Sequence, residues 1–188
     1  MKFSIAILAS GDGTNAEAIM KYFTGHLSIS VSTVMSNRME AGVLKRAEAH
    51  GILHRAFDRN QFTGGEVTTW LTEAGVTHVV LAGFLWLIPA SLLKAFPNRI
   101  INIHPALLPK FGGKGMFGRR VHESVLEAGE KTSGISIHLV NEKFDEGRIL
   151  FQAGCEVLPD DSVETLAARI RTLEHEHYPR VVERWIVA

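Results

Sequence analysis

Short apolar runs alternate with longer amphipathic segments over most of the chain. Five runs rich in Ile and Val have the length of strands that are buried on both faces: residues 3–9, 29–35, 52–57, 76–82 and 100–103. Between them lie four segments with helical length and spacing: residues 14–23, 41–50, 66–74 and 89–96. This alternation predicts an α/β fold with a doubly wound, mostly parallel sheet.

The pattern changes after Pro105. A glycine-rich stretch, residues 110–118, has no periodicity and is predicted to be a long loop of the functional or mobile kind. A predicted helix at 119–128 follows, and then two strands at 134–140 and 149–157. Only about eight residues join these strands, too few for a crossover helix, so we expect them to pair antiparallel.

A C-terminal helix is expected to begin at an N-cap formed by Asp161 or Ser162, with Glu164 in its first turn. Pro179 is expected to interrupt it, because proline lacks the amide hydrogen that a helix needs. No repeat or linker divides the 188 residues, a length that suits one domain. We therefore expect a single domain over residues 1–188.

Composition narrows the class of protein. Twenty Lys and Arg residues balance twenty Asp and Glu residues, which argues against a broad positive surface for nucleic acid or an anionic membrane. The single cysteine, Cys155, excludes an internal disulfide, fits a reducing compartment and is interpreted as filling the core. No window approaches the roughly 20 apolar residues of a membrane span. These features predict a cytoplasmic protein.

A glycine-containing turn, Ser10-Gly-Asp-Gly-Thr-Asn-Ala16, follows the first predicted strand and opens the first helix. Glycines allow a tight turn and a helix N-terminus attracts anions, so a phosphate group is a natural ligand. Gly11, Gly13 and Ala16 also satisfy the G-x-G-x-x-A pattern of dinucleotide sites. Such sites expect an acidic residue after the second strand, where this chain has Ser36-Asn37-Arg38; an Arg there could accept the 2′-phosphate of NADP. A tight turn without a ligand is the third interpretation, and the motif alone leaves all three open.

Two polar side chains stand at the end of the fifth predicted strand. Side chains alternate along a strand, so Asn102 and His104 share one face, and Pro105 ends the strand. Open α/β sheets bind their ligands at the carboxyl ends of the strands. Either residue alone could be an ordinary hydrogen-bonded strand end, but the pair, followed by the glycine-rich loop, favours a site.

Asp145 lies in the loop between the last two predicted strands, two residues before Gly147. A carboxylate beside an imidazole raises the pKa of the imidazole, which suits a general acid that works near neutral pH. The sequence by itself does not bring Asp145 to His104, and a solvated turn is the alternative. The hypothesis is that Asp145 folds back beside Asn102 and His104.

With these residues, the chain resembles the glycinamide ribonucleotide formyltransferases, which belong to the folate-dependent formyltransferase superfamily. The resemblance runs from Phe3 to about Pro179. The blocks that carry it are Ser10-Gly-Asp-Gly-Thr-Asn15, Leu81-Ala-Gly-Phe84, Asn102-Ile-His-Pro-Ala-Leu-Leu-Pro109 and the stretch from Gly134 to Asp145-Glu-Gly147. The resemblance implies a Rossmann-like formyltransferase fold and transfer of a formyl group from 10-formyltetrahydrofolate, the co-substrate, to the amine of glycinamide ribonucleotide in purine (IMP) biosynthesis.

The resemblance also implies roles for particular residues. Residues 1–100 would form a nucleotide-binding half and residues 101–188 a folate-binding and catalytic half. His104 would act as general acid, Asn102 as donor to an oxyanion, and Asp145 would raise the pKa of His104. The residues implied to bind the nucleotide substrate are Gly13, Thr14, Asn15, Ala16, Glu17 and Glu174. The residues implied to bind the folate are Arg59, Leu85, Trp86, Leu87, Ile88, Asn102, Val140, Asn141 and Asp145.

Two departures from the family pattern and several alternatives remain. The loop after Pro109 is enriched in glycine compared with the family, so its closing motion can differ. Trp86 stands where many relatives carry an Arg. Methionyl-tRNA formyltransferases and formyltetrahydrofolate deformylases usually carry an added domain, for which we expect no room here. An NADP-dependent oxidoreductase or a non-enzymatic nucleotide-binding module would leave Asn102, His104 and Asp145 unexplained. We expect small-molecule substrates only, no nucleic acid, no membrane, no metal, and a monomer or weak homodimer.

Overall fold

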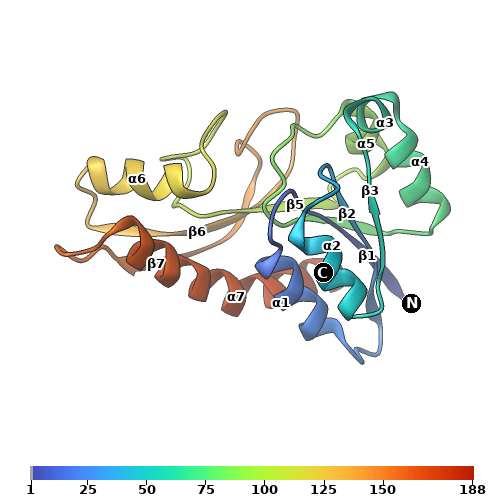
Figure 1. Ribbon diagram of the computed structural model, residues 1–188, viewed down its shortest axis with the longest axis horizontal. Coiled ribbons are helices and arrows are strands. Elements are labelled where there is room, and N and C mark those ends of the chain that lie inside the picture. The colour runs from blue at the N-terminus through green and yellow to red at the C-terminus, as the bar shows by residue number, and fades with distance from the viewer. Residues whose placement is uncertain (1) are drawn as a thin grey trace.

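The computed structural model describes residues 2–188, which form one seven-stranded sheet with helices on both faces (Figure 1). The strands are β1 (Phe3–Leu8), β2 (Ile29–Ser36), β3 (Leu53–Ala56), β4 (His78–Leu81), β5 (Ile100–His104), β6 (Thr132–Leu139) and β7 (Ile149–Glu156). The helices are α1 (Thr14–Phe23), α2 (Gly42–Ala49), α3 (Arg59–Gly64), α4 (Glu66–Glu73), α5 (Ala90–Ala95), α6 (Arg119–Glu127) and α7 (Val163–Val187).

The strand order is β3-β2-β1-β4-β5-β6-β7. Strands β1 to β5 run parallel, and β6 pairs antiparallel with both β5 and β7. The predicted fold class, a mostly parallel doubly wound sheet with an antiparallel C-terminal strand pair and a C-terminal helix, is confirmed.

Alternate residues of the central strands feed two separate cores. Ile5 and Ile7 of β1 pack with α1 and α7 on one face of the sheet. Ala6 and Leu8 point the other way and pack with α3, α4 and α5. Because side chains alternate along a strand, a strand covered on both faces must be apolar on both of them, which explains the mostly apolar runs.

Two details at one edge of the sheet differ from the sequence prediction. The run at residues 52–57 was expected to be buried on both faces, but Leu53 is 71% exposed, because β3 is an edge strand that pairs only with β2. Helix α3 was not predicted. It begins at a capping box in which the Asp58 side chain accepts from the Gln61 amide while the Gln61 side chain accepts from the Asp58 amide.

The expected interruption of the last helix at Pro179 is wrong. Helix α7 runs through the proline to Val187. Proline removes one backbone hydrogen bond, but Pro179 itself is buried and its neighbours Tyr178 and Val182 are completely buried against the sheet. The Tyr178 hydroxyl also donates to the backbone oxygen of Leu81 at 2.8 Å. Tertiary packing therefore holds the helix across a local defect.

No helix among residues 2–188 combines the length and the apolar character that a bilayer-spanning segment needs.

His78, at the start of β4, makes the stability of the fold sensitive to acid. Its ring packs edge-on against Phe3 and Trp185, with centroids 5.8 and 4.8 Å away. Burial, with a smaller effect from the charge of Arg99, lowers the pKa of His78 from 6.5 to about 4. The unfolded chain therefore takes up this proton more readily, and stability is lost as the pH falls from about 6.5 towards 4.

The unfolding free energy of the native protein should fall between pH 7 and pH 4.5. We expect this fall to be roughly 2 kcal/mol smaller in the variant His78→Phe. Phenylalanine keeps the aromatic packing and cannot bind a proton. Urea unfolding at the two pH values measures the difference. Equal losses in the two proteins would contradict the assignment.

Candidate active site

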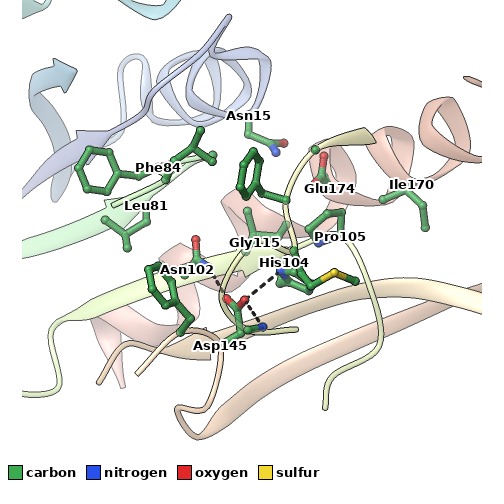
Figure 2. Close-up of a pocket in the computed structure, with 18 of the residues that line it drawn as sticks. Asn15, Leu81, Phe84, Asn102, His104, Pro105, Gly115, Asp145, Ile170 and Glu174 are labelled. Carbon is green, nitrogen blue, oxygen red and sulfur yellow. Dashed lines mark hydrogen bonds and ion pairs between the residues drawn. The ribbon is translucent and has the colours of Figure 1, made fainter. Parts of the chain in front are cut away.

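A cavity of about 860 Å³ opens at the carboxyl ends of β4 and β5. Its walls come from the segment after β4, the glycine-rich loop, the β6–β7 loop, the first turn of α1 and one face of α7. Figure 2 shows Asn15 and Glu174 close together in one part of this cavity and Asn102, His104 and Asp145 in another. Residues from both halves of the chain therefore face one cavity.

Asp145 lies at the centre of the polar cluster. One carboxylate oxygen, Oδ1, accepts from the Asn102 amide at 3.3 Å, and the other, Oδ2, accepts from the Gly113 backbone N–H at 3.0 Å. Oδ2 also lies 3.5 Å from Nδ1 of His104. Asp145 has a φ of 55°, a left-handed conformation that aspartate tolerates better than most residues. The predicted proximity of Asn102, His104 and Asp145 is confirmed.

His138 is a fourth member of the cluster that the sequence prediction did not include. The antiparallel register sets His138 directly opposite Asn102. Its Nδ1 contacts the Leu139 carbonyl at 2.8 Å, so Nδ1 carries the hydrogen, and its Nε2 lies 3.4 Å from Asp145 Oδ1 and 3.3 Å from the Asn102 amide. The β5–β6 register, rather than any motif, is the signal that finds it.

The tautomer of His104 follows from its contact with the glycine-rich loop. Nε2 of His104 lies 2.7 Å from the backbone oxygen of Phe111. A carbonyl oxygen can only accept, so Nε2 must carry a hydrogen. Nδ1 is therefore the nitrogen that gains or loses a proton, and it faces Asp145.

The charge of Asp145 raises the pKa of His104, as expected, but it is not the largest influence on that pKa. Burial lowers the pKa of His104 more than the charge of Asp145 and the hydrogen bond to Phe111 raise it, so the net pKa lies below 6.5. Burial also raises the pKa of Asp145, but the hydrogen bond to His138 and the charge of His104 outweigh it, and the net pKa lies below 3.8. At neutral pH the site therefore holds an ionised carboxylate beside a mostly neutral imidazole.

The residues implied for the nucleotide substrate divide into two groups. Asn15 and Glu174 line the cavity, and burial raises the pKa of Glu174 although a hydrogen bond with Asn15 opposes the shift. Gly13 is the N-cap of α1 with a φ of 82°, and a Cβ there would overlap Val43, so its glycine is explained by packing alone. Thr14 and Ala16 follow Gly13 in the first turn of α1, outside the cavity lining, and Ala16 is completely buried.

Glu17 points away from the cavity. Its carboxylate binds Nη1 of Arg46 at 2.7 Å and Nζ of Lys21 at 3.3 Å, which ties α1 to α2. The sequence pattern could not distinguish this ion pair from a ligand contact, because both place an acidic residue in the first turn of a helix.

Most residues implied for the folate line the cavity: Leu85, Trp86, Leu87, Ile88, Asn102, Val140 and Asp145. Two do not. Arg59 lies against Trp86, with its guanidinium carbon 4.2 Å from the ring centroid. The side chain of Asn141 accepts from the backbone N–H of Lys143 within the β6–β7 loop.

Several other charged or polar side chains line the cavity and were not predicted, among them Lys114, Arg119, His122, Lys143 and Arg171. Arg171 could have been found from the sequence, because it precedes Glu174 by three residues and the two share one face of α7.

The structure argues against a dinucleotide in the glycine turn. The cavity extends from Asn15 towards α7 and β5, and Arg38, the candidate for a 2′-phosphate, is not among its lining residues. Within residues 2–188, no group of three or more His, Cys, Asp or Glu side chains has an arrangement that could hold a metal ion.

The fold and the sequence are those of a family of one-carbon transferases. Residues 3–182 match the family described as Formyl transferase, and the chain belongs to this family.

The known proteins most informative for the comparison come from plants and bacteria. The chain is 41% identical to the chloroplastic phosphoribosylglycinamide formyltransferase of Arabidopsis thaliana and 34% identical to the phosphoribosylglycinamide formyltransferase of Haemophilus influenzae, over 95% of this chain in each case. It spans 63% of the Arabidopsis protein and 85% of the Haemophilus protein. The structure superposes on glycinamide ribonucleotide transformylase 1 from Symbiobacterium toebii with a TM-score of 0.88 and 37% identity, over 96% of this chain and 86% of that one.

Proposed function

We propose that this protein transfers the formyl group of 10-formyltetrahydrofolate to the amine of glycinamide ribonucleotide, a step of purine (IMP) biosynthesis. The observation that carries the proposal is the convergence of Asn102, His104 and Asp145 in a cavity that also contains Asn15 and Glu174. A transferase needs two substrates in one enclosed space with a proton-transfer group between them. The names of two bacterial relatives, of which this chain spans 85% and 86%, support this choice of substrates.

Each end of the cavity suits one substrate. The free amides at the N-terminus of α1 attract a phosphate, and the Glu174 carboxylate can accept hydrogen bonds from ribose hydroxyls. Arg171 adds a positive charge beside them. The apolar side chains from Leu85 to Ile88, with Val140 opposite, form a slot for the flat pterin ring. The formyl group then lies between the two ends, at the polar cluster.

The proposed reaction begins with attack of the substrate amine on the formyl carbon, which leaves a positive nitrogen and an oxyanion. His104 starts neutral, because burial lowers its pKa, so its Nδ1 can accept the proton from that nitrogen. The imidazolium that forms lies 3.5 Å from the Asp145 carboxylate, which stabilises the new charge.

Breakdown of the intermediate reverses the role of His104. The Asn102 amide, whose contacts to Asp145 and His138 are both 3.3 Å and therefore weak, turns one N–H to the oxyanion. A donor of this kind lowers such a barrier by about 2.7–4 kcal/mol. His104 returns its proton to the departing folate nitrogen as the carbon–nitrogen bond breaks, and the products are the formylated amine, now an amide, and tetrahydrofolate. No proton is gained or lost overall by the site.

A spectrophotometric assay of tetrahydrofolate formation tests the proposal. We expect turnover only when 10-formyltetrahydrofolate and glycinamide ribonucleotide are both present. Turnover without the acceptor would instead identify a hydrolase of formyl-folate, and binding of NADPH with no turnover in either mixture would support an oxidoreductase.

A further inference from the structure

Four aromatic rings form a cluster at the wall of the cavity where the segment after β4 meets α3: Phe57, Phe62, Phe84 and Trp86. The three phenylalanines are at most 9% exposed. Trp86 is half-buried, with its ring 5.7 Å from that of Phe62 and 6.1 Å from that of Phe57. The packing of three buried rings therefore fixes the orientation of the indole.

Arg59, the first residue of α3, covers the outer part of this cluster. Its guanidinium carbon lies 4.2 Å from the Trp86 ring centroid, the geometry of a cation–π contact. Other arginines, such as Arg46 and Arg169, are neutralised by carboxylates. In the part of the chain that the structure describes, residues 2–188, no ion pair involves Arg59.

The stack leaves the hydrogen-bonding edge of the guanidinium free. A guanidinium that lies on an aromatic ring uses its flat face, whereas its N–H donors point outward in the plane of the group. This planar fork matches a carboxylate. Trp86 lines the cavity and the exposed Arg59 is stacked on it, so a cation is held at a defined place next to the proposed pterin slot.

Arg59 is already implied by the family resemblance to bind the folate, and we infer that Trp86 is its positioning residue: the indole holds the guanidinium where it can receive a carboxylate from the folate tail. The inference rests on the proposed function, because the tail enters only with the folate. An arginine at position 86 would repel Arg59, whereas the indole attracts it.

Binding of two ligands that differ only in the tail tests the inference. We compare a stable 10-formyl-folate analogue that carries glutamate with the matching pteroate analogue that lacks it, by calorimetry in the absence of the nucleotide. The quantity measured is the ratio of their dissociation constants, the tail selectivity. We expect Trp86→Leu to lower the tail selectivity about threefold to tenfold.

Further variants separate positioning from simple packing. Trp86→Phe keeps an aromatic ring under Arg59 and is expected to retain most of the tail selectivity. Arg59→Ala is expected to lower it at least as far as Trp86→Leu, and adding Trp86→Leu to Arg59→Ala should lower it no further. The matched control is Trp70→Leu, because Arg55 also stacks on Trp70, at 3.8 Å, but neither residue lines the cavity.

The outcomes are distinct. If Trp86→Leu weakened both analogues equally, Trp86 would be only a wall of the slot and the inference would be overturned. An unchanged ratio in Trp86→Leu, or a further loss in the double variant, would also overturn it, with the proposed function intact. If the native protein bound neither analogue, the proposed function itself would fail.

Discussion

Replacing Asp145 with Asn is expected to lower kcat for formyl transfer at least 100-fold while the affinity for glycinamide ribonucleotide changes little. Proton transfer by a positioned group contributes about 10²–10⁴-fold. In the proposed mechanism, that transfer requires a cationic His104 intermediate, and Asp145 is the carboxylate beside its Nδ1. Asn keeps the size of the side chain and tolerates the positive φ of this position, so the fold should be retained.

The pH dependence of kcat/KM adds a second readout. His104 must begin neutral, so activity is expected to fall on the acid side as the pH drops through its pKa, which lies below 6.5. Asp145 raises this pKa, and its loss should therefore move the acid limb to lower pH. Glu174→Gln serves as the contrasting variant, since it should raise the KM for the nucleotide more than it lowers kcat. Near-native kcat in Asp145→Asn would remove Asp145 from the mechanism.

Gly147→Ala is expected to destabilise the fold by about 3 kcal/mol and to lower kcat at least tenfold. A Cβ on Gly147 would overlap the backbone oxygen of Leu139, which is part of β6. Backbone atoms cannot give way as a flexible side chain can, so the loop that carries Asp145 must move. Misplacement of a catalytic group by about 1 Å can cost about 10²-fold in rate.

A glycine on the adjoining strand provides the matched control. Gly154→Ala places its Cβ at ordinary contact distance, with the nearest atoms at 3.5 Å, and should change both quantities little. Thermal or urea unfolding together with steady-state kinetics measures the two effects. Native stability in Gly147→Ala would show that the loop relaxes, and native kcat in the folded variant would show that its exact path is unimportant.

The sequence predicted the order of most strands and helices because the sheet is covered on both faces. Buried strands such as β1 and β4 are apolar at all but one position and stand out from the helices between them. Helix α3 was missed because it has only six residues and starts at a capping box rather than at an apolar repeat. Pro179 misled the prediction, because local propensity does not include the burial of Tyr178 and its neighbours.

The site was predictable only in part, because some of its features depend on contacts between distant elements and on burial. Alternation along β5 is enough to place Asn102 and His104 on one face. The partnership of His138 with Asn102 depends on strand register, and the direction of Glu17 depends on Arg46 from another helix. The pKa of His104 also depends on burial, which no local pattern reports, so the sequence predicted the raising effect of Asp145 but not the larger lowering effect of burial.

The contact between His104 and Phe111 places a constraint on how the sequence of this protein can vary. The atom that selects the imidazole tautomer is a main-chain oxygen, and every amino acid supplies one. Exchange of the side chain at position 111 therefore leaves the acceptor in place, provided that the chain keeps its left-handed turn there, with a φ of 55°. Selection on the glycine-rich loop should therefore act on the path of its backbone. Homologous loops can then differ in amino-acid sequence while Nδ1 of the histidine keeps the same role.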